Sequence, residues 1–91
     1  MAKDNKVVYC KSYDDAKDYK YMAVVWESNT AYGDLYASDN LRQLKSFVYN
    51  EVRRLYDTAS GNIYYSSDKY CNDPIYMCWN EYSKTYSQNQ Y

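Results

Sequence analysis

The stretch LRQLKSFVYNEVRRLYDT, residues 41–58, carries the clearest structural pattern in this 91-residue chain. Its apolar side chains recur at intervals of three and four residues, which is the spacing of one buried helix stripe. The stripe consists of Leu41, Leu44, Phe47, Val48, Val52 and Leu55. Ser38 or Asp39 offers an N-cap, and Gly61 stands where a C-terminal cap residue often stands. The sequence therefore predicts an amphipathic helix over residues 41–58.

Segments rich in β-branched and aromatic residues lie on both sides of this helix. Three precede it, at residues 7–13, 19–27 and 31–37, and two follow it, at residues 62–66 and 74–79. Segment 19–27 is apolar on both of its alternating faces, so we expect it at the centre of a sheet. Gly33 is expected to mark a bulge in the third strand. The order βββ-α-ββ indicates a two-layer α+β fold, in which one helix covers one face of an antiparallel sheet of about five strands.

The length and composition favour one small domain over residues 1–91, with residues 83–91 as a frayed tail. The first half of the polar segment that begins at Asn80 could instead pair as a further strand. Eleven Lys and Arg against twelve Asp and Glu give a net charge of −1, which excludes a bulk polycation or polyanion. No stretch of this sequence has the apolar length that a membrane span or a signal peptide needs, so we expect a cytoplasmic protein without a membrane partner. The odd set of Cys10, Cys71 and Cys78 favours free thiols in a reducing compartment.

The residue types that build catalytic and metal sites are scarce. The chain has no His, which removes the commonest general base and metal ligand. Its two glycines cannot form a phosphate-binding loop. Asp14, Asp15 and Asp18 suit a hard cation in type, but Asp also favours turns and lysines stand beside them, so we interpret them as a polar turn. We expect no enzyme, no cofactor and no metal site.

Tyrosine is the extreme value of the composition, with fifteen residues against thirteen Val, Ile, Leu and Phe together. Part of these rings must therefore fill the core, and the remainder must lie on the surface. Tyr offers a large, rigid contact area at low entropic cost, which is typical of recognition surfaces. The sequence predicts a Tyr-rich docking surface that inhibits or regulates a larger protein. The expected anchors are Tyr64, Tyr65, Tyr70, Tyr76, Trp79 and Tyr82.

Two alternative functions are open at this stage. The predicted helix carries a solvent-facing basic line that is typical of contact with a phosphate backbone. Its members are Arg42, Lys45, Tyr49, Arg53 and Arg54. The local charge of segment 61–91 is −1, which counts against a nucleic-acid channel on the tyrosine-rich side. The other alternative is a homo-oligomeric structural protein, such as a homodimer, that buries its aromatic face on itself.

In general character the chain resembles the small phage-encoded inhibitors of host defence, anti-CRISPR proteins among them. The resemblance consists of the short length, one helix on a small antiparallel sheet, the missing catalytic set and the dense Tyr and Asp. It extends over the whole chain in style and over no position in detail, so it transfers no site residue. The resemblance implies binding to a larger protein or nucleoprotein, such as a CRISPR nuclease effector, in the cytoplasm of the host. The strong acidity by which some of these inhibitors imitate DNA is absent here.

Overall fold

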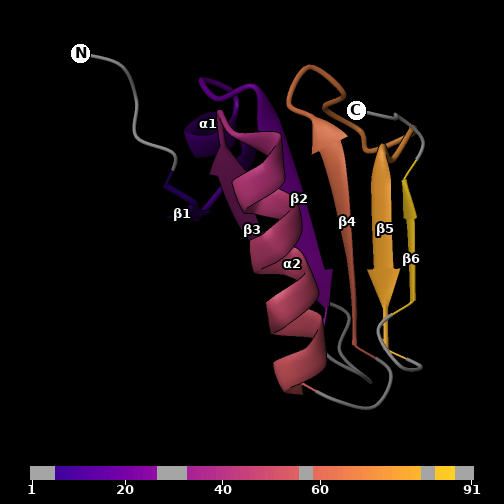
Figure 1. Cartoon of the computed structure of the whole chain (residues 1–91). Helices are drawn as coiled ribbons and strands as arrows, with labels where there is room; N and C mark the ends of the chain where they lie inside the picture. The colour runs from indigo at the N-terminus through magenta and orange to yellow at the C-terminus, as the bar shows by residue number, and fades with distance from the viewer. Residues whose placement is uncertain (1–5, 27–32, 56–58, 81–83, 88–91) are drawn as a thin grey trace.

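A computed structural model describes residues 6–26, 33–55, 59–80 and 84–87, which form an open sheet with one helix on each face (Figure 1). The helices and strands follow one another along the chain as β1 (Val8–Cys10), α1 (Tyr13–Ala16), β2 (Tyr21–Trp26), β3 (Gly33–Ser38), α2 (Leu41–Leu55), β4 (Ser60–Tyr65), β5 (Tyr76–Trp79) and β6 (Lys84–Ser87). The α+β fold with an amphipathic helix on one sheet face, predicted from the sequence, is confirmed.

The six strands lie in the order β1-β3-β2-β4-β5-β6, and every neighbouring pair is antiparallel. The central position predicted for segment 19–27 is confirmed, because β2 pairs with β3 on one side and with β4 on the other. The sheet has one strand more than the sequence pattern indicated. The additional strand is β6, which the chain forms from its polar tail and adds to the edge beside β5.

The larger core lies between α2 and the sheet. Leu44, Val48 and Val52 are fully buried against Ala23 and other apolar residues of β2, β4 and β5. The helix stripe read from the sequence is therefore the stripe that packs. Asn40, rather than Ser38 or Asp39, caps α2, because its side-chain Oδ1 accepts the backbone N–H of Gln43 at 2.9 Å.

The sequence suggested Gly61 as the C-terminal cap of the helix, but this expectation is wrong. Gly61 lies inside β4 and packs against α2. A Cβ at this position would stand 2.6 Å from Cγ1 of Val48, which real Cβ atoms do not approach. The role of this glycine is therefore close packing between helix and sheet. Gly33 likewise does not form the expected bulge, since it pairs in regular register with Trp26.

A smaller cluster covers one end of the opposite sheet face. The segment interpreted as a polar turn forms the short helix α1, which buries Ala16 against β1 and β3. Cys10, Met22, Ala37 and Tyr64 complete the buried part of this cluster. The hydroxyl of Tyr13 also donates a hydrogen bond to the carbonyl of Ser66 at 2.7 Å, which ties α1 to the segment after β4. Among the residues that the structure describes, this coverage is limited to the α1 end of the face.

Candidate functional site: an open aromatic sheet face and a cationic helix side

The expected tyrosine anchors do not form one surface. Tyr64 and Tyr76 are only 4% and 6% exposed, so neither can serve as a surface anchor in this fold, which corrects the expectation for both. Each belongs to one of the two hydrophobic clusters. The hydroxyl of Tyr64 accepts a hydrogen bond from Nδ2 of Asn62 at 3.0 Å, which satisfies the polar end of a buried ring.

The remaining expected anchors point in different directions. Tyr65 is 44% exposed and lies on the α2 face of the sheet, because it pairs with Tyr21. Tyr70 is 78% exposed in the connection between β4 and β5, where the ammonium of Lys69 lies 5.7 Å from its ring centre. Trp79 lies on the sheet face opposite α2, and Tyr82 lies outside the described residues.

Trp79 instead belongs to a group of aromatic and sulfur-containing side chains that the sequence analysis did not assemble. Cross-strand partners lie on the same face of an antiparallel sheet, and the register aligns Trp26 with Ser60 and Ser60 with Trp79. The neighbouring row aligns Met77 with Tyr86. We call this group the open aromatic face. Its members are Trp26, Met77, Trp79 and Tyr86.

The open aromatic face keeps a large exposed area. Trp79 is 38% exposed and Tyr86 48% exposed, while Trp26 and Met77 are half-buried. Gly33 lies beside Trp26, and a Cβ there would stand 3.1 Å from atoms of the indole ring. The small residue lets the indole lie close to the backbone of β3. Among the described residues, no helix covers this half of the sheet, because α1 packs at the other end, against β1 and β3.

The basic line predicted on the helix divides between the two sides of α2. Arg42 and Arg53 are exposed, and Lys45 and Tyr49 are half-buried on the side that faces β5. The ammonium of Lys45 lies 5.5 Å from the ring centre of Tyr76. We call this group the cationic side of α2. Its members are Arg42, Lys45, Tyr49 and Arg53.

Arg54 belongs to the other side of α2, which corrects its inclusion in the basic line. Its Nη2 lies 2.8 Å from Oε1 of Glu51, in an ion pair three residues apart. On that same side, Phe47 packs edge-on against Tyr36 of β3, with ring centres 4.6 Å apart. A step of one residue turns a helix by about 100°. Arg53 and Arg54 are therefore neighbours in sequence that serve different surfaces.

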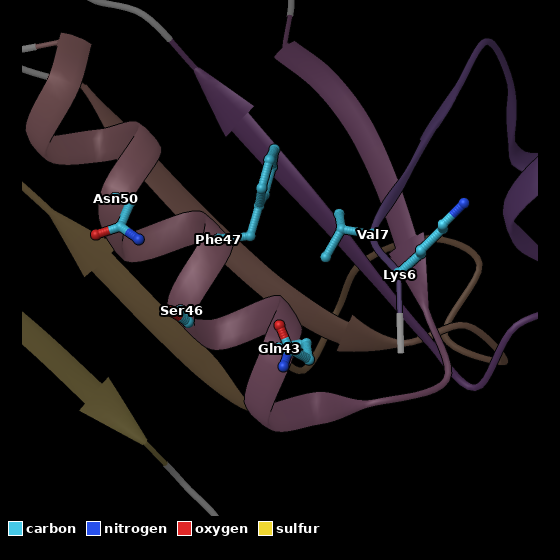
Figure 2. A pocket seen from close by; sticks show the side chains of 6 residues that line it. All are labelled: Lys6, Val7, Gln43, Ser46, Phe47 and Asn50. Carbon is cyan, nitrogen blue, oxygen red and sulfur yellow. The ribbon is translucent and has the colours of Figure 1, made fainter. Parts of the chain in front are cut away.

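Two shallow hollows adjoin α2. The first, of about 520 Å³, is lined by Tyr21, Leu41, Arg42 and Lys45. The second, of about 560 Å³, lies on the other side of the helix and is shown in Figure 2. Its lining consists of Lys6, Val7, Gln43, Ser46, Phe47 and Asn50. Figure 2 shows the side chain of Lys6 extending away from α2, so the polar groups of the second hollow do not converge on one point.

The thiols and carboxylates show no arrangement typical of catalysis in the described part of the chain. Burial raises the pKa of each thiol, Cys10, Cys71 and Cys78, which favours the unreactive protonated form. Asp14 pairs with Lys17 at 3.5 Å, and Asp15 accepts the backbone N–H of Lys11. Within residues 6–26, 33–55, 59–80 and 84–87, no cluster of three or more Cys, Asp or Glu is placed to hold a metal ion.

Comparison with known protein families, curated proteins and solved structures finds no significant match to this chain. The resemblance to anti-CRISPR proteins is therefore untested and stays a prediction. Neither helix in the described residues has the length and apolar character that crossing a bilayer requires.

Proposed function

We propose that this protein is a non-enzymatic binding protein that inhibits or regulates a larger protein by docking the open aromatic face on it. The supporting observation is the exposure of Trp79 and Tyr86 beside Trp26 and Met77, on a half of the sheet that neither helix of the described segments covers. Trp, Tyr and Met are enriched in the cores of protein interfaces. A contiguous apolar surface of this kind on a small domain is typical of an interaction site.

The chemistry of the face defines the partner surface it fits. Two indole rings, a thioether and a phenol offer apolar contact area, and Ser60 and Asn62 between the strands offer hydrogen-bond groups. A partner with an apolar surface buries these rings, and polar groups of the partner can form hydrogen bonds with Ser60 and Asn62, which lie among the rings. The resemblance stated above makes a nuclease effector or another host defence complex, in the host cytoplasm, the partner to examine first.

The test combines Trp79→Ser with Tyr86→Ser and measures capture of proteins from a lysate of the host cell by the immobilised chain. Central aromatic anchors contribute about 2 kcal/mol or more each to binding, so we expect the captured partner to be lost. The matched control is Tyr70→Ser, because Tyr70 is the most exposed tyrosine described and lies away from the face. Equal capture by the double variant and the parent chain would refute docking through this face.

Self-association is the competing use of the same surface, and sedimentation distinguishes it. The parent chain should sediment as one copy at micromolar concentration if the face is reserved for a different protein. A homodimer that the double substitution dissociates, without any captured partner, would favour the homo-oligomeric alternative and overturn the inhibitor proposal.

A further inference from the structure

Positively charged side chains are concentrated on α2. The helix carries four cationic side chains and one anionic side chain, in a chain whose net charge is −1. Its only carboxylate, Glu51, pairs with Arg54 on the side that faces β3. The cationic side therefore presents Arg42, Lys45 and Arg53 with no carboxylate of the helix among them. These three cations follow one line of about 16 Å along the helix axis.

Tyrosine rings position two of the three cations on this line, Lys45 and Arg53. The guanidinium of Arg53 lies 5.7 Å from the ring centre of Tyr49, and the ammonium of Lys45 lies 5.5 Å from that of Tyr76. A cation within about 6 Å of a ring centre is attracted by the ring face. These two long side chains are thus restrained before any ligand arrives, which lowers the entropic cost of binding an anion. Burial also lowers the pKa of Lys45, a shift that a neighbouring anion would reverse.

An aromatic platform continues the cationic side at the start of the helix. Tyr65 is 44% exposed, and its ring centre lies 5.6 Å from that of Tyr21. Tyr21 in turn lines the hollow of about 520 Å³ together with Leu41, Arg42 and Lys45. A ligand along the line of cations therefore meets an exposed phenol ring at one end. Cations in a row beside an exposed aromatic ring are the combination that single-stranded nucleic acids require, because phosphates need charge and bases need a stacking surface.

We propose that the cationic side of α2, together with Tyr65, binds single-stranded nucleic acid without sequence preference. The phosphates contact Arg42, Lys45 and Arg53, and a base stacks on Tyr65. This site lies on the sheet face opposite the open aromatic face, so a protein and a nucleic-acid strand can be bound at the same time. The proposal does not depend on the protein-docking function, because it rests on different residues.

The first experiment titrates the chain into a fluorescein-labelled oligothymidylate and follows anisotropy at several salt concentrations. Neutralisation of three phosphates predicts that log affinity falls with log salt with a slope of about −2. The informative pair of variants is Arg53→Gln and Arg54→Gln, since both remove one positive charge from adjacent positions. Arg53→Gln should make the slope shallower by about 0.7, whereas Arg54→Gln should leave the slope unchanged. Absence of binding at about 50 mM salt, or equal effects of both variants, would overturn the proposal.

The second experiment separates a nucleic acid from an acidic peptide, which the cations alone would also attract. Tyr65→Leu should weaken oligothymidylate binding by about 5- to 150-fold, because it removes the stacking ring. Tyr9→Leu is its control, since Tyr9 is 61% exposed on the same sheet face but beside Tyr36, on the other side of α2. A glutamate-rich peptide that binds as tightly as the oligonucleotide, with no effect of Tyr65→Leu, would replace the nucleic-acid ligand by an acidic protein segment. Thermal melting of each variant verifies that the fold persists.

Discussion

The two faces of the sheet are completed by very different means. On one face, the fifteen-residue α2 covers β2, β3, β4 and β5 and buries a stripe of Leu and Val. On the other face, the four-residue α1 covers one end, where its buried Ala16 packs in a cluster with Met22 and Ala37 of the sheet. The long helix closes a core, whereas the short one, within the part of the chain that the structure describes, leaves the other half of its face uncovered. The surface proposed for docking is therefore exposed because the helix on the second face is only four residues long.

The largest effect should come from truncation within the α2 core. Leu44 is fully buried there, and Leu44→Ala leaves a cavity beside the sheet. We expect the free energy of unfolding to fall by about 2–5 kcal/mol, as measured by urea denaturation. Leu44→Met, which conserves volume, should cost less than about 1.5 kcal/mol. A similar small loss for both variants would show that the α2 core is loosely packed.

The two glycines offer a matched test across the faces. At Gly61 and at Gly33 an added Cβ would approach a Val Cγ1 to 2.6 Å, that of Val48 and Val24 respectively. Val48 is fully buried and cannot move aside, so Gly61→Ala should destabilise the protein by about 1–3 kcal/mol. Gly33 is exposed, so its neighbours can shift toward solvent, and Gly33→Ala should change the stability by less than half as much. Equal losses in urea denaturation would contradict the contrast between a closed and an open face.

A double variant tests whether the contact between the new Cβ and Val48 causes the loss of stability in Gly61→Ala. Val48→Ala removes the Cγ1 atom that the new Cβ would meet. The loss in the variant carrying both Gly61→Ala and Val48→Ala should therefore be smaller than the sum of the two separate losses. Strict additivity would assign the effect of Gly61→Ala to the backbone instead.

A smaller effect is expected at Tyr64, in the cluster beneath α1. Tyr64→Phe deletes the hydroxyl that accepts the hydrogen bond of Asn62 and leaves the donor without this partner. The free energy of unfolding should fall by about 0.5–1.5 kcal/mol. Tyr65→Phe is the adjacent control and should be nearly neutral, because Tyr65 is exposed.

Tyr64→Phe should also alter how the free energy of unfolding depends on pH. Burial raises the pKa of Tyr64 above its ordinary value of 10.0. The neutral phenol therefore stabilises the folded state below pH 10, and this contribution is lost as the pH rises through the folded-state pKa. Tyr64→Phe should reduce the loss of stability between neutral pH and pH above 10, whereas Leu44→Ala should retain the full loss. The measurement is the urea midpoint of the parent chain and of each variant across this pH range. If the midpoints of Tyr64→Phe and of the parent chain fall in parallel as the pH rises, the expectation is wrong.

The sequence predicted the parts of the fold that a periodic apolar pattern encodes. The stripe of α2 and the central place of β2 both follow from local spacing, and both are confirmed. The short helix α1 was missed because its four residues bury only Ala16, which is too little for a helical period to be visible. The tail that forms β6 has no aliphatic residue, and its pairing with β5 decides its structure.

The candidate site was less accessible to sequence reasoning because it depends on register. Tyr64 and Tyr65 are identical neighbours, yet the first pairs with Met22 and is buried, and the second pairs with Tyr21 and is exposed. Trp26 and Trp79 are 53 positions apart and share a face only because β4 lies between their strands. Alternation within β2 and within β5 was visible, but the strand order that joins them was not.

The strand order also has a consequence for how the chain reaches this fold. The β4–β5 and β5–β6 ladders join strands that follow one another in sequence, whereas β2 and β4 meet across the whole of β3 and α2, with Tyr21 opposite Tyr65. Closing a segment of that length costs more chain entropy than forming either local ladder. We therefore expect the union of β2 with β4 to be the kinetic bottleneck, because it unites the two halves of the polypeptide into one cooperative unit.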